Sequence, residues 1–161
     1  MQIRKTTPKD LIAVLQIYAD ARQYMAESGN PNQWHSGHPR REIIESDISV
    51  GKSYVCVNGE EILAVFFFDI APDPTYIKID GAWPTPGEYG VVHRIARAPY
   101  NNTAKGAGAF CINWCCEHAP HIRIDTHKDN TPMLVLLQKL GFKYCGVIWL
   151  ENGEERLAFS R

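Results

Sequence analysis

The stretch from residue 89 to residue 127 constrains the fold most, because a strand pattern, a glycine loop, a helix pattern and a second strand pattern follow one another. Residues 89–98 are mostly β-branched or apolar, and residues 121–127 alternate apolar and polar side chains. Gly106 and Gly108 separate the first strand from the helix. Two strands joined through a helix favour a right-handed crossover between parallel neighbours. The sequence therefore predicts at least one parallel strand pair.

The segments on either side of this unit favour antiparallel pairing. Asn58-Gly59 and Asn152-Gly153 are dipeptides typical of tight hairpin turns. The remaining patterns predict strands at 1–5, 54–57, 62–69, 144–150 and 156–160, and helices at 8–27, 40–50 and 131–140. The length of 161 residues and the 45% hydrophobic content suit one core. We expect a single domain over 1–161 of class α/β (α+β), with a mixed, mostly antiparallel sheet of six to seven strands and about four helices.

Charge and cysteine content argue against several classes of protein. The 17 basic and 18 acidic residues give a net charge of −1, so we expect no nucleic-acid partner. The five cysteines form no C-x-x-C pair, and we expect no metal site. The longest apolar run, 62–68, is far shorter than a membrane span, and the first residues lack a signal-peptide pattern. We therefore expect a soluble, cytoplasmic protein without membrane partners.

The glycine loop suits an anion. A helix N-terminus presents unpaired backbone N–H groups, and glycines remove the Cβ atoms that would keep a phosphate away. Alternatively, Gly106 and Gly108 only allow the helix to pack closely on its strand. The sequence has no G-x-x-x-x-G-K-[ST] loop, and Cys111 replaces the third glycine of the dinucleotide-binding pattern, which leaves dinucleotide binding a remote alternative.

The motifs "HRIARAP", "TAKGAGAF" and "DNTPMLVLLQKLGF" together resemble the GCN5-related N-acetyltransferase (GNAT) family, and the order of elements matches that fold over essentially the whole chain. The resemblance implies a parallel pair, the fourth and fifth strands, that splays apart, and it implies acetyl-CoA, or coenzyme A, as the cofactor. The pantetheine arm would lie along Ile95, Ala96 and Arg97. The pyrophosphate would lie on the backbone of the loop, formed by Thr103, Ala104, Lys105, Gly106, Ala107, Gly108 and Ala109. Asn130 resembles a cofactor-side asparagine of the family, or else it only caps the helix that follows it.

The sequence departs from the family pattern at three positions. Thr103 stands where Arg or Gln is usual, and Ala104 where Gly is frequent, which is expected to weaken cofactor binding. Leu137 stands where many members have a tyrosine that protonates the leaving thiolate. The identity of the general acid is therefore open.

Acetyl transfer to an amine also needs a group that accepts the proton of the ammonium. Glu88 and His93 are candidate bases, because they lie beside or on the central strand, and Tyr144 is a candidate acid. Residues 93, 95 and 97 would share one face of that strand, so His93 alternatively has a structural role. Asp125 and His127 lie at the carboxyl end of a parallel strand, where ligands often bind, or they form a turn.

The acceptor site is expected between the first two helices and their connection. Tyr24, Gln33 and Trp34 are candidate lining residues there, and Trp83 is a candidate wall, although core packing or a homodimer contact explains these aromatic residues equally well. The sequence shows neither a carboxylate cluster nor a basic groove. We therefore expect transfer of an acetyl group from acetyl-CoA to a primary amine of a small molecule or peptide, by direct attack in a ternary complex. The alternative is a non-catalytic acyl-CoA-binding or interaction module on the same fold.

Overall fold

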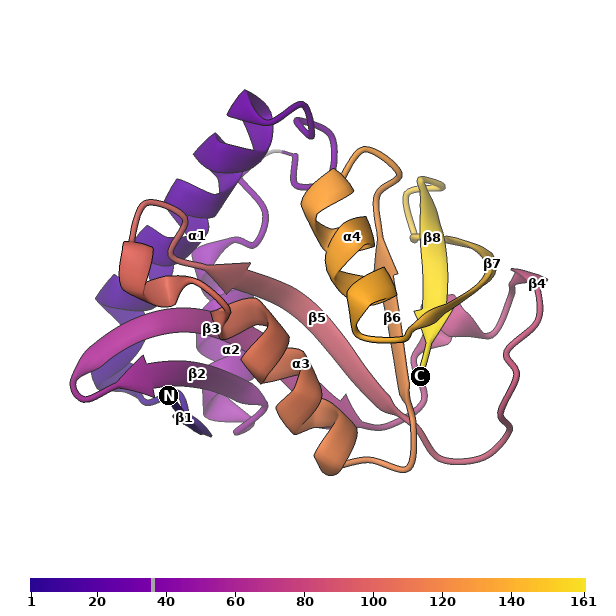
Figure 1. The fold of residues 1–161 in the computed structure, drawn as a ribbon, viewed down its shortest axis with the longest axis horizontal. Coiled ribbons are helices and arrows are strands. Elements are labelled where there is room, and N and C mark those ends of the chain that lie inside the picture. Colours follow the sequence, from indigo (N-terminus) through magenta and orange to yellow (C-terminus); the bar gives the residue numbers. More distant parts are fainter. Residues whose placement is uncertain (36) are drawn as a thin grey trace.

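The computed structural model describes residues 1–35 and 37–161, which form one twisted sheet flanked by helices (Figure 1). The sheet has the strand order β1-β2-β3-β5-β6-β8-β7-β4. Its strands are β1 Gln2–Lys5, β2 Ser53–Asn58, β3 Glu61–Ile70, β4 Asp80–Gly81, β5 Gly90–Arg97, β6 Ile122–Thr126, β7 Lys143–Trp149 and β8 Glu155–Ser160. β5 and β6 pair in parallel, and the other described pairs are antiparallel. The mixed sheet and the parallel crossover predicted from the sequence are confirmed.

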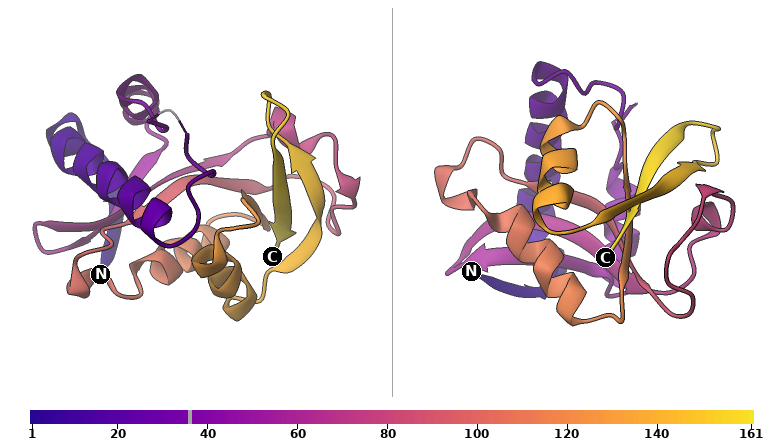
Figure 2. Two further views of the ribbon diagram at one scale, coloured as in Figure 1. Left: turned by 90° about the horizontal axis from the view of Figure 1, so that it is seen from above. Right: turned by 45° about the vertical axis from the view of Figure 1, so that its right-hand side comes forward.

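The helices cover both faces of the sheet, as the view from above in Figure 2 shows. α1 (Leu11–Glu27) and α2 (Arg41–Ser49) cover one face, and α3 (Ala107–Glu117) and α4 (Thr131–Lys139) cover the other. Asn130 caps α4 with its side chain, which was one of the two alternatives for this residue, and Pro132 lies in the first turn of that helix. No helix among the described residues is long and apolar enough to cross a membrane.

The structure contains one strand more than the six to seven expected. β4 is a two-residue strand, Asp80–Gly81, inside the segment 72–86, whose four prolines disfavour regular backbone. It pairs with β7, where Gly81 lies opposite Gly146. A Cβ on Gly146 would stand 2.1 Å from the carbonyl oxygen of Asp80, so the two backbones approach at a distance that only glycine allows. The sequence showed the glycines but not their pairing.

A β-bulge in β5 changes which residues face which side. Val65 lies opposite Ala96 and Phe67 opposite His93, so β5 has one residue more than β3 in this interval. Arg94 adopts the left-handed φ of 50° there. As a result, Val92 and Ile95 both pack toward the α3 side, whereas Ala96 packs toward α1. The expectation that residues 93, 95 and 97 share one face is therefore wrong, because it assumed unbroken alternation.

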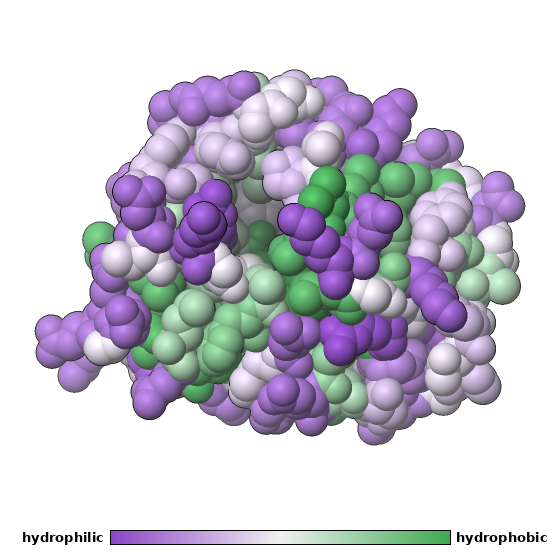
Figure 3. Space-filling model, in the orientation of Figure 1, coloured by the Kyte–Doolittle hydropathy of each residue, from purple (hydrophilic) through white to green (hydrophobic). Residues whose placement is uncertain are grey.

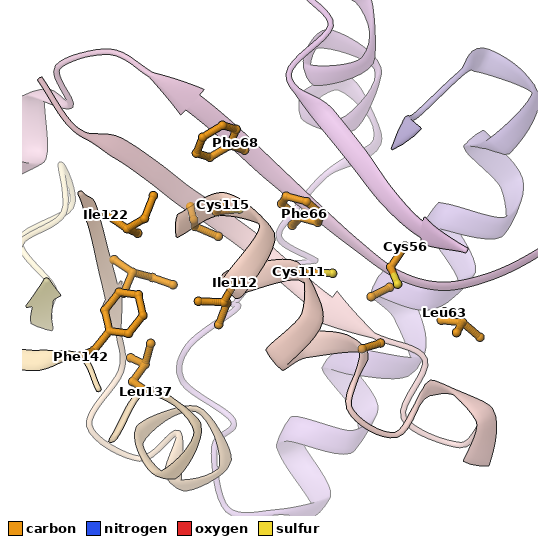
Figure 4. Packing of buried hydrophobic residues seen from close by; sticks show 14 of the residues in the cluster. Cys56, Leu63, Phe66, Phe68, Cys111, Ile112, Cys115, Ile122, Leu137 and Phe142 are labelled. Carbon is orange, nitrogen blue, oxygen red and sulfur yellow. The ribbon is translucent and has the colours of Figure 1, made fainter. Parts of the chain in front are cut away.

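Leu137 belongs to the core beneath α4. Its side chain is fully buried in a cluster with Ile112, Ile122 and Phe142 (Figure 4). Met133 and Leu136 of α4 pack partly against the same cluster, and they also line a cleft described below, which Leu137 does not reach. The position at which the family often has a catalytic tyrosine is thus a packing position in this chain.

We predict that Leu137→Tyr destabilises the protein and adds no catalytic acid. The larger side chain overfills a closed site, which costs about 1–3 kcal/mol, and its buried hydroxyl adds about 1–3 kcal/mol if it finds no partner. Equilibrium urea unfolding measures the loss. Val135→Tyr is the matched control on the same helix, since Val135 is 42% exposed. A Leu137→Tyr protein as stable as the parent would contradict this account of the core.

Candidate functional site

Two clefts meet where β5 and β6 separate. The parallel register covers only Gly90 with Ile122 and Val91 with Arg123, so the strands diverge beyond Val91. We call the two spaces the glycine-loop cleft, of about 350 Å³, and the histidine cleft, of about 560 Å³. Both are lined by Met25, Ile95, Asn130 and Met133. Figure 3 shows the molecule hollowed between α1 and α4, with apolar residues gathered on the α4 side.

The glycine-loop cleft lies between the end of α1, the start of α3 and α4. Seven of the predicted cofactor residues line it: Ile95, Ala96, Arg97, Gly106, Gly108, Ala109 and Asn130. Gly106 is the N-cap of α3 with a left-handed φ of 86°, and a Cβ on it would meet nothing within 4 Å. The cations of Arg97 and Lys139 also line this cleft. The arrangement provides free helix N–H groups and positive charge, which together suit a phosphorylated ligand.

Fewer residues of the predicted phosphate loop have free backbone N–H groups than the sequence analysis expected. The N–H groups of Thr103, Ala104 and Lys105 already donate to the side chain of Asn101 or to the carbonyls of Asn101 and Asn102. The side chains of Ala104 and Ala107 are fully buried. The hydroxyl of Thr103 donates to Glu61 at 2.9 Å, so this residue braces the loop against the sheet. The amides left for an anion are those from Gly106 to Ala109.

Asn130 joins the two clefts. Its Oδ1 accepts from the N–H of Met133 at 3.3 Å, which caps α4, and its Nδ2 donates to Oε1 of Gln33 at 2.6 Å. Thr126 donates to the same Gln33 oxygen at 3.3 Å. Asn130 is therefore a helix cap that also lines both clefts, and its contact with a cofactor stays a prediction. Gln33 ties the loop before α2 to the start of α4.

His93 lies in the histidine cleft between two carboxylates. Its Nε2 is 2.6 Å from Oδ2 of Asp73, and its Nδ1 is 3.9 Å from Oδ2 of Asp125. Tyr76 donates its hydroxyl to Asp125 at 2.8 Å. The side chains of His93, Asp73 and Asp125 are 22%, 15% and 12% exposed, so they are shielded yet reach the cleft.

Asp73 is held as a carboxylate. Burial acts to raise its pKa, but hydrogen bonds from His93 and Thr75 outweigh the burial and hold the pKa at about 2. With Asp73 ionised and accepting from Nε2–H, a neutral His93 keeps its lone pair on Nδ1. The nitrogen on the Asp125 side is then able to accept a proton.

The histidine cleft is also lined by basic side chains. It carries His38, Arg40, Arg94 and Arg156. Burial lowers the pKa of His38, and the charges of Arg94, Arg156, Arg22 and Arg40 lower it further. The sequence analysis did not find this group, because these arginines are far apart in sequence and only the fold brings them together, beside the carboxylates of Asp73, Asp125 and Glu154.

Arg94 is fixed in place by its neighbours. Its guanidinium bonds Asp47 of α2 at 2.8 Å and lies 4.6 Å from the centre of the Phe67 ring. The carbonyl of Arg94 accepts from the hydroxyl of Tyr18 of α1 at 2.9 Å. Burial raises the pKa of Asp47, whereas the charge of Arg94 acts to lower it. The two helices thus hold the bulge of β5 from one side.

The other predicted site residues take different places. Gln33 and Trp34 line the histidine cleft, whereas Tyr24 lines the glycine-loop cleft. Trp83 lines neither, and it packs on Tyr76 and Arg123 near β4. Its indole N–H donates to the carbonyl of Tyr76 at 2.9 Å.

Glu88 and Tyr144 also lie outside both clefts. Glu88 is exposed just before β5, at the end where the strands are still paired. Tyr144 of β7 is 58% exposed and touches Phe159 edge-on. Of the three candidate catalytic residues, His93 lies where β5 and β6 separate, and Glu88 and Tyr144 do not. Asp73 was missed by the sequence analysis, and its only signal was an Asp-Pro pair inside a segment that predicted loop.

No protein-family model and no curated protein match this sequence. Among solved structures, the chain is similar to a GNAT family acetyltransferase from Streptococcus agalactiae. That pair shares 29% identity with a TM-score of 0.87, over 99% of this chain and 94% of the other. A putative acetyltransferase from Staphylococcus aureus is 24% identical with a TM-score of 0.71, over 100% of this chain and 98% of the other.

A more distant likeness shows the fold alone. The ribosomal-protein-S18-alanine N-acetyltransferase of Escherichia coli is 14% identical with a TM-score of 0.64, over 99% of this chain and 91% of the other. The neighbour from Streptococcus agalactiae supports acetyl transfer in general. The resemblance to the GCN5-related N-acetyltransferases is confirmed, and the chain has the GNAT fold of that family.

Proposed function

We propose that this protein is an acetyl-CoA-dependent N-acetyltransferase that acts on a primary amine by direct attack in a ternary complex. The observation that carries the proposal is the meeting of the two clefts at the β5–β6 splay, where Ile95 and Asn130 line both. Two reactants that enter from separate clefts can meet there without a covalent enzyme intermediate. Proximity of this kind is a large part of the catalysis of group transfer.

The glycine-loop cleft fits acetyl-CoA, which supplies an activated acetyl thioester when bound. Gly106 and Gly108 leave room for the pyrophosphate at the start of α3, and Arg97 and Lys139 supply positive charge. Beyond Val91, β5 has no register partner in β6 among the described residues, so its backbone is open to an extended ligand with amide groups.

His93 is proposed as the proton acceptor in the neighbouring cleft. A primary ammonium with a pKa of about 10 must lose a proton before it attacks a carbonyl carbon. An ammonium between Nδ1 of His93 and Asp125 would be attracted by the carboxylate and would find a lone pair on the imidazole. Asp73 orients the ring through Nε2 and is a positioning residue.

We predict that Gly108→Asp abolishes acetyl-CoA binding in a folded protein. A carboxylate at the second residue of α3 would repel the pyrophosphate, and like charges in such contact cost several kcal/mol, so affinity should fall by about a hundredfold or more. The helix should tolerate the change, since an acidic residue near its N-terminus is favourable and a Cβ would meet Leu136 at an ordinary 3.5 Å. Isothermal titration calorimetry measures the affinity.

Gly108→Asn is the matched control, because it has the same shape without the charge. Gly106→Asp is a less clean test, since the left-handed φ of 86° strains any side chain there. Binding of acetyl-CoA by folded Gly108→Asp with the affinity of Gly108→Asn would place the pyrophosphate elsewhere. If NAD rather than CoA raised the melting temperature of the parent, a dinucleotide-binding function would replace this proposal.

We predict that His93→Gln lowers kcat by about 10²- to 10⁴-fold, the usual worth of a positioned base. Glu88→Gln and Tyr144→Phe should each retain activity close to that of the parent, because both residues lie outside the clefts. Release of free thiol from acetyl-CoA with an amine acceptor, read against a blank without acceptor, measures all three.

A large loss in Glu88→Gln with an active His93→Gln would contradict the assignment of the base. A large loss in Tyr144→Phe alone would make that tyrosine the acid. Binding of acetyl-CoA without turnover on any amine or peptide would favour the alternative, a non-catalytic acyl-CoA-binding module.

A further inference from the structure

The histidine cleft is lined by side chains of both charges. The carboxylates of Asp73 and Asp125 lie on either side of His93. Arg40, Arg94 and Arg156 line the same cleft, and their charges act on His38. The cleft volume of about 560 Å³ falls in the range of small-ligand sites. A ligand that fills this cleft can therefore contact both carboxylates and arginines.

Of the arginines that line the cleft, two are paired with carboxylates among the described residues and one is not. Arg94 is paired with Asp47 at 2.8 Å, and Arg156 with Glu154 at 3.0 Å. Glu154 also lies 2.9 Å from His35. Arg40 has no carboxylate partner within the part of the chain that the structure describes.

The pKa of His38 is lowered in the field of these arginines. Burial is the largest cause of this shift, and the four further causes are all arginine charges. The arginine charges that add to this shift would stabilise an anion at the same place. The arginines come from α1, α2's leading loop, β5 and β8, so the field is a property of the fold and not of one charged segment.

We infer that the acceptor is amphoteric: a primary amine that carries a carboxylate, with the ammonium at Asp73 and Asp125 and the carboxylate at Arg40 and His38. The inference rests on the proposed function. A diamine would place its second ammonium against the arginines, where like charges repel. A plain alkylamine would leave Arg40 without a counter-charge. A single unbalanced arginine suits a monoanion better than a doubly charged phosphate.

The test compares three series of matched length: ω-amino acids with two to six methylenes, n-alkylamines and α,ω-diamines. Calorimetry with the CoA-bound protein measures affinity, and thiol release with acetyl-CoA measures kcat/KM. At the best length, the amino acid should exceed the alkylamine by about 10- to 100-fold, the usual worth of a hydrogen bond to a charged group. An ω-aminoalkylphosphonate of the same length should be the weaker ligand.

Arg40→Glu should invert the preference, because it removes the cation and supplies a partner for a second ammonium. Arg41→Glu is the control with the same change of charge, since Arg41 pairs with Glu45 on the surface of α2 and does not line the cleft. It should leave the preference of the parent unchanged. An equal effect of the two substitutions would overturn the inference.

The outcomes separate the acceptor class from the proposed activity. If ω-amino acids bind selectively and none is acetylated, the amphoteric site stands and the activity fails. If alkylamines or diamines are acetylated as well as ω-amino acids, the activity stands and the amphoteric site is wrong. A phosphonate that binds better than the carboxylate would overturn the choice of anion.

Discussion

The left-handed backbone at Arg94 is the constraint on which the site depends. A non-glycine residue with φ of 50° costs free energy, and it persists only where its surroundings fix it. Asp47 binds the guanidinium from α2, and Tyr18 binds the carbonyl from α1. The extra residue bends β5 where it leaves β6 and reverses the faces of the residues that follow. Ile95 therefore lies at the junction of the two clefts, next to His93.

Most of the fold followed from local patterns. Periodicity, caps and Asn-Gly turns are short-range signals, and the helices and longer strands lie within a few residues of their predicted bounds. The bulge and β4 could not be found in this way. Arginine is not a residue that marks left-handed backbone, and β4 exists only because Gly81 meets Gly146, which is 65 residues away along the chain. Tertiary contact, and not local propensity, determines both features.

The part of the site that comes from one stretch of sequence could be predicted, whereas the part that comes from several distant segments could not. The glycine loop and the strand before it are one stretch of sequence, and both line one cleft. The histidine cleft is lined by Asp73, His93, Asp125 and Arg156, which come from four separate segments, so no sequence motif indicates it. Glu88 is close to His93 in sequence but lies at the other end of the strand. Because a strand rises about 3.3 Å per residue, residues that are close in sequence can lie far apart along it.

The replacement of a tyrosine by buried Leu137 fits a site that depends on its base more than on its acid. Thiols have a pKa of around 8.5, so a thiolate leaves readily near neutral pH without a dedicated proton donor. A primary ammonium, with a pKa of about 10, holds its proton about thirtyfold more tightly than a thiol does. The difficult proton is therefore the one on the acceptor side, where two carboxylates and an imidazole lie together. The α4 side of the glycine-loop cleft therefore needs no acidic group, and Met133 and Leu136 make it apolar.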